Sequence, residues 1–256
     1  MKTRLALLGA TCLDGIRGIG KVFILFGQVL WWLFVKWPRR DIIVFQLYQI
    51  GNRSVPVVVA TGLFVGMVLA VQTYYQFVKL NVQSVIGAVV GLSMVKELGP
   101  VLTGTMLAGR VGSAIAAELG TMKVTEQIDA LESLATNPVR FLVLPRFIAC
   151  FVLTPVLTIV ADMVGMVGGY AVAVLGFGIS HHYYVQYTIQ QIWAWDVMVG
   201  VLKAFVFGAI IALVSCYKGF QAGEGAEGVG RAATESVVVS FMSILIANFF
   251  LTLMMG

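Results

Sequence analysis

Residues 54–78 contain no charged side chain and lie between Arg53 and Lys79. Because an α-helix rises about 1.5 Å per residue, a run of this length crosses the roughly 30 Å hydrocarbon core of a bilayer. Ser54 and Pro56 are typical of a helix start, since serine caps the first turn and proline is tolerated there. We therefore predict a transmembrane helix over residues 55–78.

The rest of the chain has the composition of a membrane protein. Hydrophobic residues make up 59% of its 256 residues and charged residues 11%, against roughly a quarter charged in ordinary soluble domains. Apolar stretches predict four further spans, over residues 84–108, 141–177, 196–217 and 234–255. The stretch 141–177 exceeds one span, so we expect it to protrude on one side and to bend near Pro155. The prediction is an all-α integral membrane protein, with residues 1–256 forming one domain.

The first 45 residues form a segment that precedes the core of residues 46–256. Its apolar part, residues 22–35, is too short to cross a bilayer. Trp31, Trp32 and Trp37 lie at one end of this part and basic residues flank it. This pattern favours an interfacial or re-entrant helix. A short, tilted span is the alternative.

The distribution of basic residues orients the predicted spans. Placing residues 1–53, 110–146 and 218–231 on one side collects most of the 17 Lys and Arg residues there, whereas the opposite loops hold only Lys79. By the positive-inside rule the N-terminus is cytoplasmic and the C-terminus lies outside. The net charge of +5 therefore reflects membrane boundaries, and no nucleic-acid partner is implied.

The polar stretch between Arg110 and Arg140 is predicted to contain a short amphipathic helix. An apolar stripe at helical spacing is formed by Val124, Ile128, Leu131 and Ala135. Another face carries Glu126, Asp129 and Glu132. An acidic face disfavours contact with the anionic cytoplasmic leaflet, so docking of a soluble partner is preferred to a helix lying on the membrane.

Lys96 and Glu97 are adjacent charges inside the second predicted span, followed by Gly99 and Pro100. Neighbours on a helix point about 100° apart, so each of these charges needs a partner of its own. Pro100 has no N–H for the carbonyl of Lys96, which leaves that acceptor exposed at a kink. Charges within a membrane cost about 2.5–3.5 kcal/mol each by insertion scales. We expect a polar spot that faces a cavity or the interior of the bundle.

Other small and polar residues within the spans predict helix contacts. Asp162 is a functional candidate because it is ionisable and intramembrane, although a buried hydrogen bond to a neighbouring helix explains it equally well. Small residues four apart mark close helix packing, within or between subunits. These pairs are Gly62 and Gly66, Gly87 and Gly91, and Gly165 and Gly169.

No catalytic, cofactor or metal site is predicted in this chain. The segment "GEGAEG", residues 223–228, matches a dinucleotide fingerprint but follows a membrane span, and Glu224 and Glu227 would repel a pyrophosphate. The P-loop pattern GxxxxGK[ST] does not occur, so ATP and Mg²⁺ would be used by a separate subunit. His181 and His182 lack further metal-ligand neighbours in the sequence and fit an interfacial aromatic belt better than a metal site.

Four segments of the core resemble the MlaE/YrbE permease family: residues 46–72, 95–131 ("VKELGPVLTGTMLAGRVGSAIAAELGTMKVTEQIDAL"), 137–146 and 227–240. The resemblance covers residues 46–256. It implies the permease subunit of an Mla-type ABC transporter in the bacterial inner membrane. Such a permease works as a homodimer, with an ATPase subunit on each cytoplasmic face and a ring of MCE-domain lipid-binding subunits, expected to be a hexamer, outside. A small STAS-domain protein is a further possible partner.

The resemblance also assigns roles to residues. It implies movement of phospholipids between the inner membrane and a periplasmic MCE carrier, which maintains outer-membrane lipid asymmetry. The expected lipid cavity lies between protomers and includes Lys96, Glu97, Gly99, Pro100, Gln72, Tyr74 and Tyr75. The expected coupling helix, residues 121–135, contacts the ATPase through Glu126, Ile128, Asp129, Leu131 and Glu132. Two alternatives remain: a proton-coupled secondary transporter that uses Glu97 and Asp162 as relay carboxylates, and a membrane scaffold for the lipid carrier.

Overall fold

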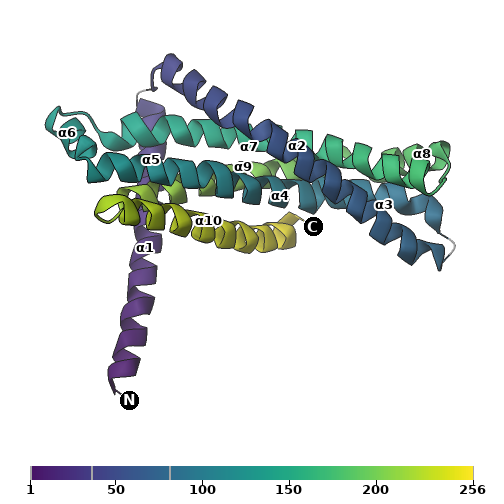
Figure 1. The fold of residues 1–256 in the computed structure, drawn as a ribbon, viewed down its shortest axis with the longest axis horizontal. Helices are drawn as coiled ribbons and strands as arrows, with labels where there is room; N and C mark the ends of the chain where they lie inside the picture. The colour runs from purple at the N-terminus through teal and green to yellow at the C-terminus, as the bar shows by residue number, and fades with distance from the viewer. Residues whose placement is uncertain (1, 36, 81, 256) are drawn as a thin grey trace.

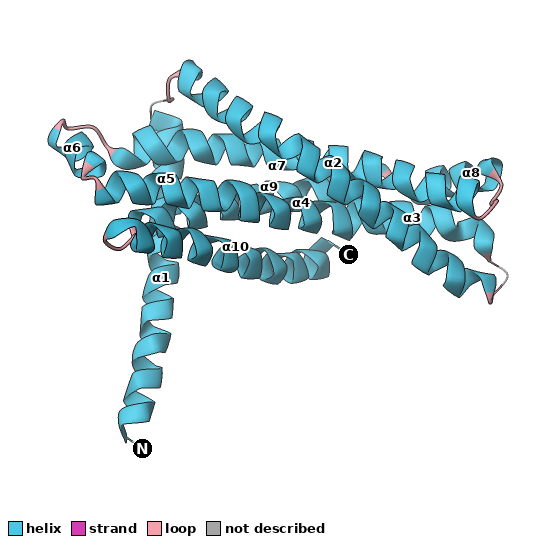
Figure 2. Ribbon diagram, in the orientation of Figure 1, coloured by secondary structure: helices cyan, strands magenta, loops and turns pink. Residues whose placement is uncertain are grey.

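The computed structural model describes the backbone of residues 2–35, 37–80 and 82–255, with side chains from residue 17 onward except those of residues 19 and 84. Every regular element in these ranges is helical (Figure 2). Five helical runs are long and apolar enough to span a membrane: Arg40–Val78, Ile86–Val124, Val139–Gly176, Ala194–Phe220 and Gly225–Met255. The predicted all-α fold with five spans is confirmed.

Several of these runs are composite helices. The first run is α2 (Arg40–Val78), and a short 3₁₀ turn, η1 (Gln83–Val85), leads into the second. The second run consists of α3 (Ile86–Ser93), η2 (Met94–Leu98), α4 (Gly99–Leu107), η3 (Ala108–Gly112) and α5 (Ser113–Val124), where η2 and η3 are π-helical. The third consists of the π-helical η4 (Val139–Val143), α7 (Leu144–Tyr170) and the π-helical η5 (Ala171–Gly176). The last two are α9 (Ala194–Phe220) and α10 (Gly225–Met255).

The N-terminal helix α1 (Lys2–Val35) runs across the long axis of the bundle (Figure 1). Leu25 and Val29 are buried in the main core, and the guanidinium of Arg140 lies 5.6 Å from the centroid of the Trp32 ring. A helix that crosses the bundle on its outside fits an interfacial segment better than a span, because its axis lies along the membrane plane when the five runs cross the membrane.

Small residues bring α2 and α7 into close backbone contact. A Cβ at Gly62 would lie 2.9 Å from the carbonyl oxygen of Ala161, and one at Gly66 would collide with the backbone of Gly165. A Cβ at Gly87 would collide with the side chain of Thr188, and one at Gly91 would collide with the side chain of Ile192. The predicted small-residue pairs are therefore helix contacts within one chain, since only glycine lets these backbones approach so closely.

The structure corrects two predicted boundaries. The second span does not end at residue 108, because α5 continues it to Val124 and buries Ile115 and Leu119 against the core. Residues 113–124 include good helix formers such as alanine, which sustain the helix beyond Arg110. The expected loop at 178–195 contains α8 (His181–Gln191), whose Tyr184 is buried against α3 and the end of α7.

Candidate functional site

The candidate site is built around η2, the π-helical segment that contains Lys96 and Glu97. Pro100 follows two residues after this segment and supplies no N–H, so the carbonyl of Lys96 is free to accept another donor. The Nζ of Lys203, on α9, donates to that carbonyl at 3.1 Å. The exposed acceptor predicted from Pro100 thus exists, and a lysine from a neighbouring helix satisfies it. Single π-helical turns often occur at functional sites.

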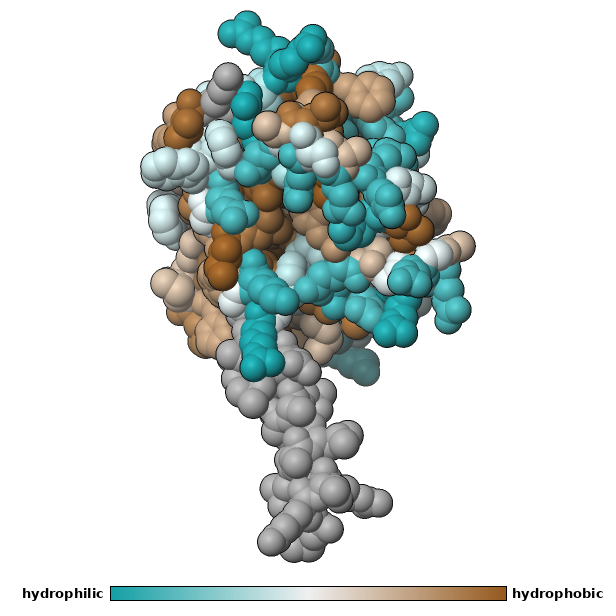
Figure 3. All heavy atoms as spheres, turned by 90° about the vertical axis from the view of Figure 1, so that its left-hand side faces the viewer, coloured by the Kyte–Doolittle hydropathy of each residue, from teal (hydrophilic) through white to brown (hydrophobic). Residues whose placement is uncertain are grey.

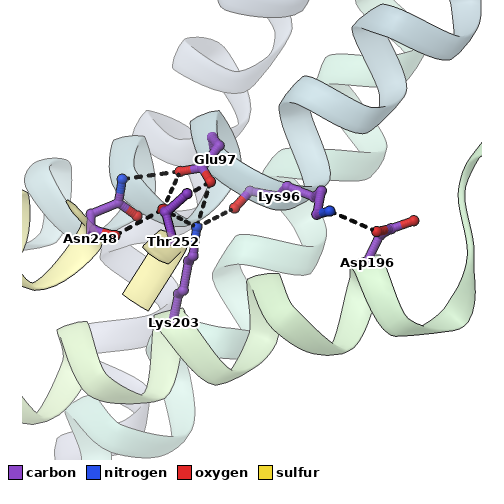
Figure 4. A network of polar contacts seen from close by, with 6 residues as sticks. All are labelled: Lys96, Glu97, Asp196, Lys203, Asn248 and Thr252. Carbon is purple, nitrogen blue, oxygen red and sulfur yellow. Dashed lines mark hydrogen bonds and ion pairs between the residues drawn. The ribbon is translucent and has the colours of Figure 1, made fainter. Parts of the chain in front are cut away.

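Glu97 joins three transmembrane runs through its carboxylate. Its Oε1 accepts from the Nζ of Lys203 at 2.6 Å and from the hydroxyl of Thr252 at 3.1 Å. Its Oε2 accepts from the Nδ2 of Asn248 at 3.0 Å. Lys203 also contacts the Thr252 oxygen at 2.9 Å. We call Glu97, Lys203, Asn248 and Thr252 the Glu97 cluster; Figure 4 shows them converging from the second run, α9 and α10.

Lys96 points away from this cluster and pairs with Asp196 at 3.1 Å (Figure 4). The other carboxylate oxygen of Asp196 accepts from the backbone N–H of Trp193 at 2.9 Å, which fixes the start of α9. The prediction that Lys96 and Glu97 need separate partners is confirmed. The Lys96 side chain keeps 30% of its surface exposed, whereas that of Lys203 keeps 1%, so Lys96 is the accessible cation of the two.

These charges lie near one end of the spans instead of at their middle. Asp196 is in the first turn of α9 and Thr252 is in the last turn of α10. Trp193 and Trp195 precede Asp196 and keep 72% and 59% of their surface exposed, as is typical of residues at a membrane interface. The position of Lys96 within the predicted span indicated the bilayer centre; the tertiary contacts place it closer to the boundary opposite α6 (Gln127–Ser133).

A hollow of about 240 Å³ opens beside the charged residues. Its lining residues are Leu92, Ser93, Lys96, Glu97, Val199, Lys203, Thr252 and Met255. Of the other residues predicted for a cavity, Gly99 is buried against Asp162 and Pro100 is buried near Gly200. Tyr74 stacks on Phe177 at 3.8 Å between ring centroids, and Gln72 and Tyr75 are exposed on α2. None of these five lines the hollow, so a lipid contact for them stays a prediction.

Asp162 lies behind the site, on α7. It keeps 8% of its surface exposed, and its Oδ1 has no hydrogen-bond partner among the described residues. A Cβ at Gly99 would collide with that oxygen. The contact explains why glycine stands at residue 99, since Asp162 fills the space that a side chain would need.

The sequence reading missed Lys203, Asp196, Asn248 and Thr252. Lys203 could have been found, because an ionisable residue inside a predicted span is a functional candidate by default. Asp196 marks the predicted start of a span, which hides its role as an ion-pair partner. Asn248 and Thr252 carry no comparable signal, since uncharged polar residues near the end of a span are unremarkable until a partner is known.

The predicted coupling helix is shorter than expected. Residues 121–135 divide between the end of α5 and α6, because Glu126 adopts a left-handed backbone conformation with φ of 58°. Within the predicted apolar stripe Ile128 is buried and Leu131 is partly buried, but Val124 and Ala135 are exposed, so the stripe is wrong at both ends. The three acidic residues, Glu126, Asp129 and Glu132, are exposed as expected. Asp129 pairs with Lys123 at 2.9 Å.

Hydrophilic residues gather on the face of the molecule that carries α6 (Figure 3). Arg146, buried at 3% exposure, binds Glu118 at 2.8 Å and so ties α7 to α5 near this end. Lys218 and Glu235 link α9 to α10 at 2.8 Å. These ion pairs thus link neighbouring helices at the α6 end of the bundle, where the helices leave the apolar layer.

Five apolar helical runs that enclose ion-paired residues define a multi-pass helical membrane protein. Residues 43–254 match the family described as Permease MlaE, and the chain belongs to this family. The matched residues include all five membrane-spanning runs except three residues at the start of α2 and one at the end of α10. The resemblance seen in the sequence is confirmed.

Curated relatives align with nearly the whole chain. A probable ABC transporter permease protein of Rickettsia typhi is 44% identical over 96% of this chain and 95% of its own length. A protein of the same description from a Synechocystis strain is 41% identical over 91% and 89%. The intermembrane phospholipid transport system permease protein MlaE of Haemophilus influenzae is 33% identical over 98% and 97%.

Proposed function

We propose that this chain is the permease subunit of an ABC transporter that moves phospholipids between the bacterial inner membrane and a periplasmic MCE-domain carrier. The observation that carries the proposal is Lys96, a partly exposed cation at the rim of a mostly apolar hollow near a membrane boundary. A phospholipid presents a phosphate at that depth and acyl chains below it. The Haemophilus relative, named for intermembrane phospholipid transport, supports this substrate.

The two charges in η2 have different roles in this proposal. Lys96 attracts the lipid phosphate as a point charge, in competition with Asp196. Glu97 holds the second run to α9 and α10 through the Glu97 cluster, so a movement of either helix is transmitted to the turn that carries Lys96. A change in the spacing of these helices would alter the hollow and the accessibility of Lys96 together.

A homodimer fits the distribution of buried surface. Within the most apolar part of each run, the share of buried residues is 11% in α10 and 28% in α2, compared with 56% in α9. The exposed faces of α2 and α10 are free for a second copy of the chain, and the hollow beside α10 would then face the partner across a shared cavity. Lipid tails require such an apolar enclosure.

Coupling to ATP hydrolysis is assigned to α6. The exposed residues Asp129 and Glu132 of α6, with Glu126 just before it, form an acidic surface for an ATPase subunit. Ile128 and Leu131 pack this segment against the bundle. Because α6 follows α5, which belongs to the same run as Lys96, a push on α6 reaches the site along one composite helix. A STAS-domain protein would join the ATPase. In this orientation the N-terminus would be cytoplasmic and the C-terminus periplasmic. The transporter would maintain outer-membrane lipid asymmetry.

The test is phospholipid transfer in proteoliposomes that contain the permease, its ATPase and an MCE-domain acceptor. Glu97→Lys is expected to abolish ATP-dependent transfer while the ATPase still co-purifies, because the substitution places two cations against each other beside the hollow. Asp41→Lys, on an exposed residue at the start of α2, is the matched control. Unchanged transfer by Glu97→Lys would remove Glu97 from the mechanism.

The same preparation separates the alternatives. Transfer driven by an imposed pH gradient without ATP, and lost in Asp162→Asn, would identify a proton-coupled transporter instead. Assembly with the MCE-domain protein but no transfer under either condition would indicate a scaffold. Charge reversal at Glu126, Asp129 and Glu132 is expected to release the ATPase in a pull-down, whereas reversal at Glu224 and Glu227 is the control. Retained ATPase binding would show that the docking face lies elsewhere.

A further inference from the structure

A second hollow lies between α2 and the η3–α5 part of the second run and has a volume of about 80 Å³. Its lining residues are Gln46, Gln49, Ile50, Arg53, Arg110, Val111, Ala114, Ile115 and Glu118. Two guanidinium groups and two side-chain amides thus converge on a space of the size of a small polar group. Arg110 belongs to the π-helical segment η3.

Neither arginine of this hollow is paired with a carboxylate in the part of the chain that the structure describes. Arg110 donates from Nη1 to the hydroxyl of Ser54 at 2.8 Å, and that hydroxyl donates to the carbonyl of Ile50 at 2.6 Å. Glu118 is the acidic residue of the lining, but its Oε1 is bound by Arg146 at 2.8 Å. Among the described residues, neither Arg53 nor Arg110 has an ion-pair partner. Two guanidinium groups that share a hollow repel each other unless an anion lies between them.

The arginine pair lies at the depth of a membrane boundary. Arg53 immediately precedes the charge-free residues 54–78 of α2, and Arg110 is fourteen residues, or about 21 Å of helix, from Lys96. Lys96 lies near the boundary opposite α6, so the arginine pair lies at the boundary on the α6 side. Lipid phosphates lie at this depth, and guanidinium groups bind phosphate oxygens through paired hydrogen bonds.

We propose that this hollow binds the phosphate group of an anionic phospholipid in the leaflet on the α6 side. The contacts are made by the guanidinium groups of Arg53 and Arg110 and the amides of Gln46 and Gln49. Ser54 fixes the guanidinium of Arg110, whereas that of Arg53 is more exposed. This arrangement suits capture of a headgroup from the membrane. The bound lipid would join α2 to α5 just before the chain enters α6. This site is separate from the hollow at Lys96 and does not depend on the transport proposal.

The experiment measures lipid retained by the full-length protein after purification. Protein is reconstituted in nanodiscs of phosphatidylcholine with phosphatidylglycerol, extracted in mild detergent and examined by native mass spectrometry. Loss of one charge-assisted contact is worth about 1.5–3 kcal/mol, so Arg53→Gln is expected to lower phosphatidylglycerol binding by about tenfold or more. Arg39→Gln is the matched control, because Arg39 is a 79% exposed arginine just before the same helix, outside the hollow.

Four further outcomes decide the proposal. Arg53→Lys is expected to retain part of the binding, since it keeps the charge and loses the paired geometry. If millimolar inorganic phosphate displaces the lipid from the wild type but not from Arg53→Gln, the phosphate chemistry is supported. Binding of inorganic phosphate without any retained phosphatidylglycerol would assign the site to a free anion and overturn the lipid assignment. Equal phosphatidylglycerol retention by wild type, Arg53→Gln and Arg39→Gln would overturn the site altogether.

Discussion

The Glu97 cluster and the arginine pair are two charged sites on the same composite helix, each at a π-helical turn. At the first, Lys203, Asn248 and Thr252 satisfy the carboxylate of Glu97 from two other helices. At the second, the hydroxyl of Ser54 is the hydrogen-bond partner of the Arg110 guanidinium among the described residues, and Arg53 is exposed. One site is electrostatically complete within the chain, and the other is completed only by an anion from outside.

This difference shows that the role of a charged residue in a membrane helix depends on the groups that pair with it. A carboxylate that accepts hydrogen bonds from two other helices fixes the spacing of those helices, because removing one member leaves another without its partner. An unsatisfied pair at the boundary is tolerated because headgroups and water solvate it, and it therefore contributes little to folding. The following substitutions test this contrast through the free energy of unfolding in detergent.

Lys203→Met should have the largest effect. It leaves the Glu97 carboxylate, whose side chain is 38% exposed, without its cation, which costs about 1.5–3 kcal/mol, the worth of a hydrogen bond to a charged group. Denaturant titration of the purified protein gives the value. The double variant Lys203→Met/Glu97→Gln should recover most of the loss, because neither member is then left charged and unpaired. Equal stability of the single and double variants would show that the pair does not govern the cluster.

Gly99→Ala and Gly109→Ala compare the packing next to each site. A Cβ at Gly99 collides with the Oδ1 of Asp162 and lies 2.9 Å from the carbonyl of Met94, whereas nothing lies within 4 Å of one at Gly109. We expect Gly99→Ala to lose about 1–3 kcal/mol from overpacking. Gly109→Ala should be neutral or slightly stabilising, since alanine favours a helix by about 0.5–1 kcal/mol. Similar losses in both variants would contradict the difference in packing.

Thr252→Val should cost about 1 kcal/mol, the typical worth of a hydrogen bond, because it removes the hydroxyl that contacts both Glu97 and Lys203. Thr252→Ser keeps that hydroxyl and should stay near the wild type in the same denaturant titration. Destabilisation of the serine variant to the level of the valine variant would assign the effect to the lost methyl group.

The Lys96–Asp196 pair should couple weakly. Both residues keep part of their side-chain surface exposed, 30% and 12%, and exposed ion pairs contribute about 0.2–1 kcal/mol. A double-mutant cycle with Lys96→Met and Asp196→Asn measures the coupling free energy directly. A value as large as that of the Glu97–Lys203 pair would mean that Lys96 is not available for a phosphate.

Arg53→Gln should have the smallest effect on stability. Surface substitutions without a specific partner stay within about 0.5 kcal/mol, and relief of repulsion from Arg110 shifts the value toward stabilisation. The measurement is made in detergent without added anionic lipid. A large loss would show that Arg53 is part of the folded core, in contrast to its exposed position.

The extent of prediction from sequence differs between elements. The five spans follow from charge-free stretches, and the need of Lys96 and Glu97 for separate partners follows from helix geometry. The continuation of the second span to Val124 does not follow from the sequence, because Arg110 marks the start of a polar stretch. In the structure a π-helical turn presents this arginine at the edge of α2. The length of α6 was overestimated, since a periodic apolar pattern does not reveal the left-handed residue Glu126 that interrupts the helix.

The sequence by itself determined that this protein is an all-helical membrane protein of the MlaE permease family, because hydrophobic length and motif residues are local properties of the chain. The tertiary structure alone decided which partners the charges have. Lys203 and Thr252 are more than a hundred residues from Glu97 in the chain, and only the packing of α9 and α10 against the second run brings them within hydrogen-bonding distance. The packing of α2 beside η3 and α5 brings Arg53 and Arg110 to one hollow, without an ion-pair partner among the described residues, which turns two boundary arginines into a candidate binding site.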